Sequence, residues 1–388
     1  MRFQRRDPSF LTKWFFQTDR AILYSVLGLI LVGVYMLIAA GGVSAARIGQ
    51  QPLYFFIKAL APMGIGLFAL FFFSFLPRKQ IIYLSALLGT ITAALVLATL
   101  ISPTCVKGSC RFLTVLGQQI HPSELLKPFF ILLTAVFLSQ LPPCGEVETA
   151  KRFRWGVYLA ITLPLLATIF IRKDFGMTLI YFGTFWAMLF FAGYGWKPLT
   201  GLASGAIGLL GIAFATMPHV RKRLLGEGDG YQVNQALDAI RNGGFIGQSN
   251  SSFVKSTLPD SHTDFVFAAF VEDRGILAGV ALLGLYLWLL ARILKLMRDM
   301  TDMTTKLVCG GTVALMTMHL ILNIGTTLNI TPAKGTILPF ISYGGSAFIS
   351  MCAVFGILLG LLRSYKFPSP PSFNKSVGKA DTTRKEFS

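Results

Sequence analysis

The chain has 388 residues, of which 54% are hydrophobic and only 13% are charged, and its mean hydropathy is +0.64. Soluble domains usually have about a quarter of their residues charged, so this composition excludes an ordinary soluble protein. The formal net charge is +18, and the chain is predicted to be an integral membrane protein.

Ten apolar segments are predicted to be transmembrane helices, because a spanning helix needs roughly 20 mostly apolar residues. They cover residues 21–40, 55–76, 81–101, 124–141, 155–171, 175–192, 199–217, 265–291, 306–327 and 345–362. Strands of a membrane barrel would instead show alternating apolar runs of about ten residues. The first segment lacks a small-residue cleavage site, so it is predicted to remain as an anchor rather than to be a signal peptide.

The predicted fold class is therefore an all-α integral membrane protein with about ten transmembrane helices. A polytopic domain over residues 21–365 follows a basic N-terminal segment at 1–20. The tail at 366–388 is rich in Pro and Ser and is expected to be disordered.

The positions of Lys and Arg predict the orientation. With the N-terminus in the cytoplasm, 21 of the 35 Lys and Arg residues lie in cytoplasmic segments, and 14 lie outside or within spans. This bias agrees with the positive-inside rule. Both termini are then cytoplasmic, and residues 218–262 form a large extracytoplasmic loop between spans seven and eight.

This loop is longer than most of the other connections, and long loops in compact architectures are usually functional. Five of its residues are basic: Arg221, Lys222, Arg223, Arg241 and Lys255. One interpretation is a solvated loop that binds anionic lipid. The other is a site for a phosphorylated substrate, because Arg and Lys are the natural partners of phosphate oxygens.

Residues 230–244, within the loop, predict a short amphipathic helix that ends at Gly-Gly. The residues on its apolar face are Val233, Ala236, Leu237 and Ile240.

Three clusters of ionisable residues interrupt apolar regions, where charges are costly and usually mark a site or pathway. In the first, Glu124 and Lys127 lie three residues apart and face one side of a helix; a structural ion pair after a helix-starting Pro is the alternative. The second, residues 172–176, is a tight external turn that contains Asp174. An ordinary charged turn would also explain it.

The third cluster consists of Asp264, Glu272, Asp273 and Arg274. Glu272 follows Asp264 by eight residues, so both project to a similar face, about 12 Å apart along the helix. In the first helical turn Asp264 would meet the positive end of the helix dipole, with Ser261 or Thr263 as N-cap. Asp264 is thus a capping acid or a catalytic carboxylate, and Glu272 and Arg274 are expected to form a buried pair.

Residues 339–346, Pro-Phe-Ile-Ser-Tyr-Gly-Gly-Ser, precede the last span. The Gly-Gly-Ser could expose backbone N–H groups to an anion, or it could be a tight turn with a Ser N-cap. The five cysteines show no metal-ligand spacing. Cys105 and Cys110 share an external loop and could pair in an oxidising compartment, whereas Cys309 and Cys352 are expected to be small core residues; the fifth is Cys144.

Taken together, these segments resemble the SEDS family (shape, elongation, division and sporulation), the RodA and FtsW proteins that polymerise peptidoglycan. The family motif P-E-x-H-T-D-F-I-F matches residues 259–267, and Q-P-S-E-x-x-K matches 121–127 with His121 in place of Gln. The motif P-D-L-G appears as Lys173-Asp174-Phe175-Gly176, and S-G-G appears as Asn242-Gly243-Gly244. G-Y-Q matches 230–232, and L-P-x-x-S-Y-G-G-S-S matches 338–347 except for the last Ser.

Two segments depart from the family pattern. The family's R-R-W is Cys110-Arg111-Phe112 here, and its glycine-rich run is thinned to residues 247–250. Lys334, within residues 332–335, favours the division branch (FtsW) over the elongation branch (RodA).

The resemblance implies a peptidoglycan glycosyltransferase that polymerises lipid II, a disaccharide-pentapeptide on undecaprenyl pyrophosphate. A carboxylate can take the proton of the acceptor hydroxyl, and this role is assigned to Asp264. Developing charge on the leaving group needs cations; the candidates are Arg221, Arg223, Lys255, Lys127 and Arg111, with Glu124 holding Lys127 in position. The other candidate substrate-binding residues are Asp174, Gln232, His262, Thr263, Ser342 and Tyr343.

No cofactor is required by these residues, although a divalent cation, Mg²⁺ or Mn²⁺, could assist at the pyrophosphate. The resemblance also implies a place in the bacterial cytoplasmic membrane at the division septum. The implied partners are a class B penicillin-binding protein transpeptidase, other division proteins and membrane lipids, with no nucleic acid.

Two alternatives remain, a flippase that moves lipid II and a scaffold that only recruits division proteins. No inverted repeat or pair of broken helices is evident in the sequence, which disfavours a transporter.

Overall fold

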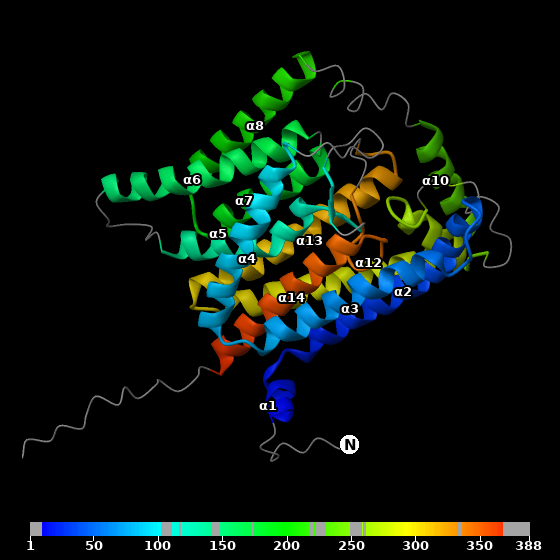
Figure 1. Ribbon diagram of the computed structural model, residues 1–388, viewed down its shortest axis with the longest axis horizontal. Coiled ribbons are helices and arrows are strands. Elements are labelled where there is room, and N and C mark those ends of the chain that lie inside the picture. The colour runs from blue at the N-terminus through cyan, green and yellow to red at the C-terminus, as the bar shows by residue number, and fades with distance from the viewer. Residues whose placement is uncertain are drawn as a thin grey trace, which may run out of the picture.

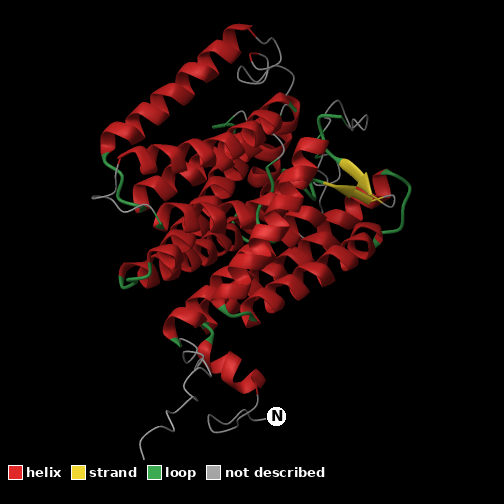
Figure 2. Ribbon diagram, turned by 60° about the vertical axis from the view of Figure 1, so that its left-hand side comes forward, coloured by secondary structure: helices red, strands yellow, loops and turns green. Residues whose placement is uncertain are grey.

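The computed structural model describes residues 10–101, 111–115, 118–140, 148–172, 174–216, 221, 230–248, 258, 261–331 and 336–367. In these ranges the chain is nearly all helical, and its long helices run side by side in a bundle (Figures 1 and 2). The fold is an all-α membrane protein, as predicted.

The helices are α1 (Phe10–Gln17), α2 (Arg20–Arg47), α3 (Tyr54–Phe75), α4 (Arg78–Ala98), α5 (Pro122–Ser139), α6 (Glu148–Ile171), α7 (Phe175–Phe191), α8 (Trp196–Thr216), α10 (Gly230–Gly243), α12 (Val266–Arg298), α13 (Met303–Thr327) and α14 (Gly345–Lys366). Two short antiparallel strands, β1 (Leu113–Val115) and β2 (Gln118–Ile120), pair Leu113 with Ile120. Each predicted span overlaps one of these helices. In the described part of the chain, α2 to α6 and α12 to α14 are long and apolar enough to cross a membrane, and α7 is a shorter apolar helix.

The centre of the bundle is formed by α5, α13 and α14, which are mostly buried, whereas only a minority of the residues of α3, α4 and α6 are buried. Two glycines on one face of α14 allow a close approach to α3. A Cβ atom at Gly356 would lie 2.7 Å from the Leu70 carbonyl oxygen, and one at Gly360 would lie 2.5 Å from that of Phe73. Small residues four apart let membrane helices pack backbone to backbone. The helix α14 therefore packs closely against α3.

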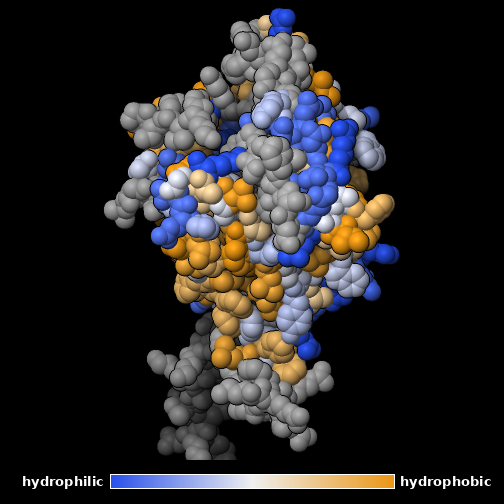
Figure 3. Space-filling view, turned by 90° about the vertical axis from the view of Figure 1, so that its right-hand side faces the viewer, coloured by the Kyte–Doolittle hydropathy of each residue, from blue (hydrophilic) through white to orange (hydrophobic). Residues whose placement is uncertain are grey.

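The surface agrees with a membrane environment. Figure 3 shows a broad apolar band across the middle of the molecule, with hydrophilic surface gathered above it. Large apolar side chains such as Leu31, Phe68 and Leu277 are more than half exposed. Together with the spans, this band identifies a multi-pass membrane protein.

Ion pairs of Asp19, which precedes α2, connect three helices at one end of the bundle. The Arg292 guanidinium donates to the Asp19 carboxylate at 2.7 Å, and the Lys366 ammonium lies at 3.4 Å. Burial tends to raise the pKa of Asp19, but the hydrogen bonds from Arg292 and Ile22 and the charges of Arg292 and Lys366 hold it below its ordinary value. These pairs join α2, α12 and α14 at the same level.

The helix α12 is broken at Gly275, where φ is 84° and ψ is 167°, although a continuous span was predicted. The turn that follows α10 fills the break: Ile276 N–H donates to the Gly244 carbonyl at 2.9 Å, and Gln248 N–H donates to that of Glu272 at 2.9 Å. A Cβ atom at Gly275 would lie 2.2 Å from the Phe245 carbonyl oxygen. The break therefore depends on a segment about 30 residues earlier in the chain.

Candidate active site

Asp264 lies in a turn at residues 261–265, directly before α12. The helix begins at Val266 with Phe265 as its N-cap, so Asp264 stands outside the helix and not in its first turn. The predicted N-caps, Ser261 and Thr263, were therefore wrong. The Asp264 side chain is half-buried, and its position gives it no N-cap role.

Asn323, on α13, holds the backbone of Asp264. Its side-chain amide donates to the Asp264 carbonyl at 2.9 Å and to the Thr336 carbonyl at 2.8 Å. Asn323 is fully buried. The sequence analysis missed this residue, although a lone amide in an apolar span is the kind of signal that marks a site.

The segment before α14 packs against the Asp264 turn from a second side. The Ser342 hydroxyl donates to the Thr263 carbonyl at 2.7 Å and accepts from Leu338 N–H at 2.8 Å, and Tyr343 N–H donates to the His262 carbonyl at 2.8 Å. The structure thus brings Ser342 and Tyr343 to His262, Thr263 and Asp264. These five predicted site residues form one unit, the Asp264 clamp.

The Gly-Gly-Ser at the start of α14 does not use its Ser as a helix cap. Gly344 is the N-cap of α14, and the Ser346 hydroxyl instead accepts from His121 N–H at 3.1 Å. This contact joins the start of α14 to the start of α5.

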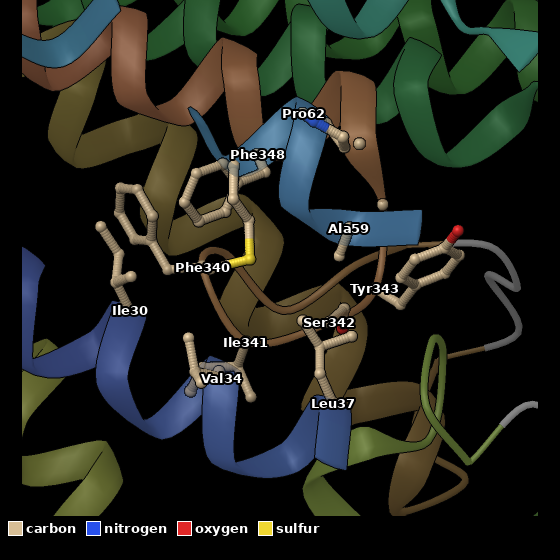
Figure 4. A pocket seen from close by; sticks show the side chains of 14 residues that line it. Ile30, Val34, Leu37, Ala59, Pro62, Phe340, Ile341, Ser342, Tyr343 and Phe348 are labelled. Atoms are coloured by element: carbon tan, nitrogen blue, oxygen red, sulfur yellow. The ribbon is translucent and has the colours of Figure 1, made fainter. Parts of the chain in front are cut away.

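Aromatic rings cover one side of the Asp264 clamp. The Phe55 ring lies 4.3 Å from the His262 ring and 5.3 Å from the Tyr343 ring, between centroids. His262 Nδ1 lies 3.0 Å from the Ser44 hydroxyl of α2. Figure 4 shows the adjoining pocket, which is lined by apolar residues of α2 and α3 and by the segment 340–345.

Glu124 and Lys127 form the predicted ion pair on α5, and Lys127 is fully buried. The Lys127 ammonium also donates to His319 Nε2 at 2.9 Å, and His319 Nδ1 lies 3.2 Å from the Ile337 carbonyl. Because an ammonium group only donates, Nδ1 carries the proton and donates to Ile337. His319, which the sequence analysis missed, therefore connects the pair to the segment that holds Ser342.

Asp174, at the start of α7, is bound by Arg111 and His121. The Arg111 guanidinium lies 3.0 Å and His121 Nε2 lies 3.1 Å from its carboxylate oxygens. Burial tends to raise the pKa of Asp174, but the His121 hydrogen bond and the charges of His121 and Arg111 hold it below its ordinary value. This turn is therefore built into the bundle rather than being an ordinary exposed turn.

The expected Glu272–Arg274 pair does not form. Glu272 is fully buried and accepts from the Asn242 amide at 3.1 Å, whereas Arg274 is exposed and lies 3.4 Å from the Asp273 carboxylate. Residues two apart on a helix project to opposite sides, which explains the error.

The predicted amphipathic helix is confirmed as α10, which ends at Gly243. Its buried residues Val233, Ala236 and Ala239 pack with Phe265 and Ala268 at the start of α12. Gln232 on α10 is half-buried.

Several predicted residues are not part of the described cluster. Arg221 is exposed. Arg223, Lys255, Lys334, Cys105, Cys110 and Cys144 lie outside the described residues. Cys309 and Cys352 are buried free thiols, as predicted. Within the described ranges, no group of three or more His, Cys, Asp or Glu could hold a metal ion.

A family model described as "Cell cycle protein", for FtsW, RodA and SpoVE, matches residues 19–366. The chain belongs to this FtsW/RodA/SpoVE family. The resemblance inferred from the motifs is confirmed, and the family explains why six short motifs occur in one order along the bundle.

Relatives extend over most of the chain. A probable peptidoglycan glycosyltransferase FtsW from Caulobacter vibrioides is 29% identical over 98% of this chain and 98% of its own length. One from Coxiella burnetii is 30% identical over 88% of this chain and 95% of its own. Stage V sporulation protein E from Bacillus subtilis is 29% identical over 90% of this chain and 98% of its own.

Solved structures share the fold of this FtsW/RodA/SpoVE protein. A chain of a peptidoglycan synthase complex, described as coordinating polymerization and crosslinking, superposes with a TM-score of 0.74 at 25% identity, over 90% of this chain and 98% of that one. The rod shape determining protein RodA of Thermus thermophilus superposes with a TM-score of 0.66 at 24% identity, over 90% and 97%.

Proposed function

We propose that this protein is a peptidoglycan glycosyltransferase that polymerises lipid II, releases undecaprenyl pyrophosphate and acts in septal cell-wall synthesis. The observation that carries the proposal is the Asp264 clamp. A half-buried carboxylate stands outside its helix, on a backbone held by Asn323 from α13 and by Ser342 through Thr263. A general base needs such fixed geometry before its pKa matters.

The geometry is compatible with the following reaction. The acceptor sugar hydroxyl attacks the anomeric carbon, and the bond from that carbon to the pyrophosphate oxygen breaks. Asp264 takes the hydroxyl proton, and the pyrophosphate leaves on its undecaprenyl carrier. Asn323 and Ser342 are positioning residues, because each acts on the backbone at or beside Asp264.

The buried pair changes the role assigned to Lys127. Its ammonium is enclosed by Glu124 and His319 and is fully buried, so we assign it to holding the segment 336–342 rather than to the leaving group. The Arg111 side chain is about a quarter exposed beside Asp174. Arg111 therefore remains the candidate cation near Glu124, Lys127 and His319. The loop residues Arg221, Arg223 and Lys255 complete the proposed cation set.

The orientation, location and partners are also proposals. The positive-inside bias supports cytoplasmic termini, and with that orientation the Asp264 clamp faces the outer side of a bacterial cytoplasmic membrane. The relatives named FtsW support a location at the division septum. A class B penicillin-binding protein transpeptidase is the proposed partner, supported by the relative found within a peptidoglycan synthase complex. The chemistry requires no cofactor, and a Mg²⁺ or Mn²⁺ ion would serve only to neutralise the diphosphate.

A flippase remains the second candidate, because α12 is broken at Gly275 and broken helices are typical of transporter sites. Purified protein given labelled lipid II in vesicles separates the possibilities. Glycan polymer supports the glycosyltransferase. Leaflet exchange without polymer supports the flippase. If neither polymer nor leaflet exchange is observed, the scaffold is the remaining possibility.

A further inference from the structure

Arg274 is an exposed cation on the membrane-facing flank of the bundle. Its side chain is 49% exposed, while Leu277 and Val280 in the following turns of α12 are exposed apolar residues. On the adjoining helix α2, Leu31 and Ile38 are also exposed. A charge beside so much apolar surface is costly unless it has a partner; among the described residues, the ion-pair partner of Arg274 is the Asp273 carboxylate, 3.4 Å from its Nε.

The Arg274 guanidinium is held in a fixed orientation. Its Nε donates to the Tyr35 hydroxyl at 2.7 Å, and the guanidinium lies 4.6 Å from the centre of the Tyr35 ring. The Tyr35 hydroxyl also bonds to the buried Asp273 carboxylate. All of these contacts use Nε or the ring face, and among the described residues Nη1 and Nη2 make no hydrogen bond. The forked end of the guanidinium is thus held ready for a planar, bidentate acceptor.

The depth of Arg274 in the membrane follows from α12. The apolar stretch between Arg274 and Arg292 has 17 residues, about 26 Å of helix, and the hydrocarbon core of a bilayer is roughly 30 Å thick. Arg292 pairs with Asp19 at one end of the bundle. Arg274 therefore lies near the opposite edge of the hydrocarbon, and because helical side chains lean toward the helix N-terminus, its guanidinium reaches toward the headgroups.

The turn that carries two exposed apolar side chains lies beside Arg274, because a Cβ atom at Gly247 would lie 2.6 Å from the Arg274 Cα. Phe245 is 75% exposed and Ile246 is 85% exposed, on the turn that fills the break in α12 through the Gly244 carbonyl. Apolar side chains at the bilayer boundary enter the headgroup and acyl region. This arrangement fits a ligand with both a phosphate and a hydrocarbon tail, and it does not fit a phosphate ion in solution.

We propose that Arg274, oriented by Tyr35 and flanked by Phe245 and Ile246, binds the phosphate of a membrane lipid in the leaflet on the Asp264 side of the bundle. Two sources share this chemistry: the phosphodiester of a bulk phospholipid and the phosphate of a polyprenyl lipid. Nη1 and Nη2 donate to two phosphate oxygens, and the acyl or prenyl chain runs down the apolar surface of α2 and α12.

The test is lipid retention by the purified full chain, measured by native mass spectrometry with three probes: phosphatidylglycerol, diacylglycerol with the same acyl chains, and undecaprenyl phosphate. The wild type should retain the two phosphate lipids and not diacylglycerol. Arg274→Gln should weaken that retention about tenfold, which corresponds to about 1.4 kcal/mol and to the lower end of a hydrogen bond to a charged group. Arg241→Gln is the matched control, because Arg241 is an exposed arginine on α10 that pairs with Asp238.

A second variant keeps the test informative if Arg274→Gln folds poorly. Tyr35→Phe keeps the ring under the guanidinium but removes the hydroxyl that orients it, so retention should fall by a smaller factor. Tighter binding of undecaprenyl phosphate than of phosphatidylglycerol would support the proposal with a polyprenyl source, and the reverse order would support it with a phospholipid source. Equal retention by wild type and Arg274→Gln, equal loss in Arg241→Gln, or equal binding of diacylglycerol would overturn it.

Discussion

The side chain of Asn323 on α13 donates to the backbone carbonyl of Asp264, at 2.9 Å, across 59 residues of sequence. The same amide donates to the Thr336 carbonyl at 2.8 Å. One buried side chain therefore sets the distance between the turn that presents the carboxylate and the segment that carries Ser342 and Tyr343. Asn323 therefore positions the half-buried Asp264 carboxylate through its main chain.

Asp264→Asn should abolish most polymerisation and leave the protein folded. A general base contributes on the order of 10²–10⁴-fold in rate, and the amide keeps the size of the carboxylate but cannot accept the proton. Glycan polymer made from lipid II by the purified variant measures this loss. A rate within a few-fold of wild type would assign the base to another carboxylate, with Asp174, Asp260 and Glu124 as the next candidates.

Asn323→Ala should lower the turnover rate and leave the apparent affinity for lipid II nearly unchanged. The substitution removes the donors to the Asp264 and Thr336 carbonyls, and a displacement of about 1 Å at a reacting group can cost about a hundredfold in rate. Separate measurement of kcat and KM checks this.

Thr312→Ala is the control for Asn323→Ala, because Thr312 is a buried polar residue on the same helix whose hydroxyl has no hydrogen-bond partner in the described part of the chain. That variant should keep the wild-type rate. If Asn323→Ala loses thermal stability but keeps its kcat, Asn323 has only a structural role.

The contribution of Asp174 to stability should depend on pH. Its pKa in the folded protein is below the ordinary value of 3.8, because the His121 hydrogen bond and the charges of His121 and Arg111 outweigh burial. A carboxyl group with a depressed pKa stabilises the fold above its unfolded-state pKa, and that stabilisation is lost as the pH falls through the folded value.

The melting temperature of wild type should therefore exceed that of Asp174→Asn by a constant margin at neutral pH. The margin should shrink as the pH falls below about 3.8. A margin that stays constant as the pH is taken well below 3.8 would show that the ion pairs of Asp174 contribute nothing to stability.

Gly275→Ala should destabilise the protein strongly. The residue would have to adopt a φ of 84°, and its Cβ atom would lie 2.2 Å from the Phe245 carbonyl oxygen. With a ψ of 167°, this backbone conformation is essentially restricted to glycine and costs about 1–3 kcal/mol for a residue with a Cβ. Gly284→Ala on the same helix meets nothing within 4 Å and should gain up to about 1 kcal/mol. Melting temperatures of the two variants compare them directly, and equal values would mean that the break at Gly275 is not required.

Much of the candidate site was visible in the sequence, but as separate pieces. Asp264, Glu124, Lys127 and Asp174 were singled out because charges are rare in apolar spans, and the motif at 338–347 was recognised by resemblance. His319 and Asn323 were missed because single polar residues in a span show no spacing that predicts a partner. Their partners, Lys127 and Asp264, are 192 and 59 residues away.

The sequence by itself determined the helices. The last predicted span, at 345–362, corresponds to Gly345–Lys366, because a segment in hydrocarbon must satisfy its backbone hydrogen bonds internally and therefore forms a helix wherever it is long and apolar enough. Local composition is sufficient for that outcome.

Only the tertiary structure decided how α12 is interrupted and which residues meet. The φ of 84° at Gly275 is imposed by the turn after α10, whose carbonyls accept the N–H groups freed by the break. Glu272 is buried with Asn242, and Arg274 is turned toward the membrane with Tyr35. Each of these contacts joins segments 30 or more residues apart, and no local pattern encodes them, because burial and hydrogen bonding between distant elements depend on how the whole bundle packs.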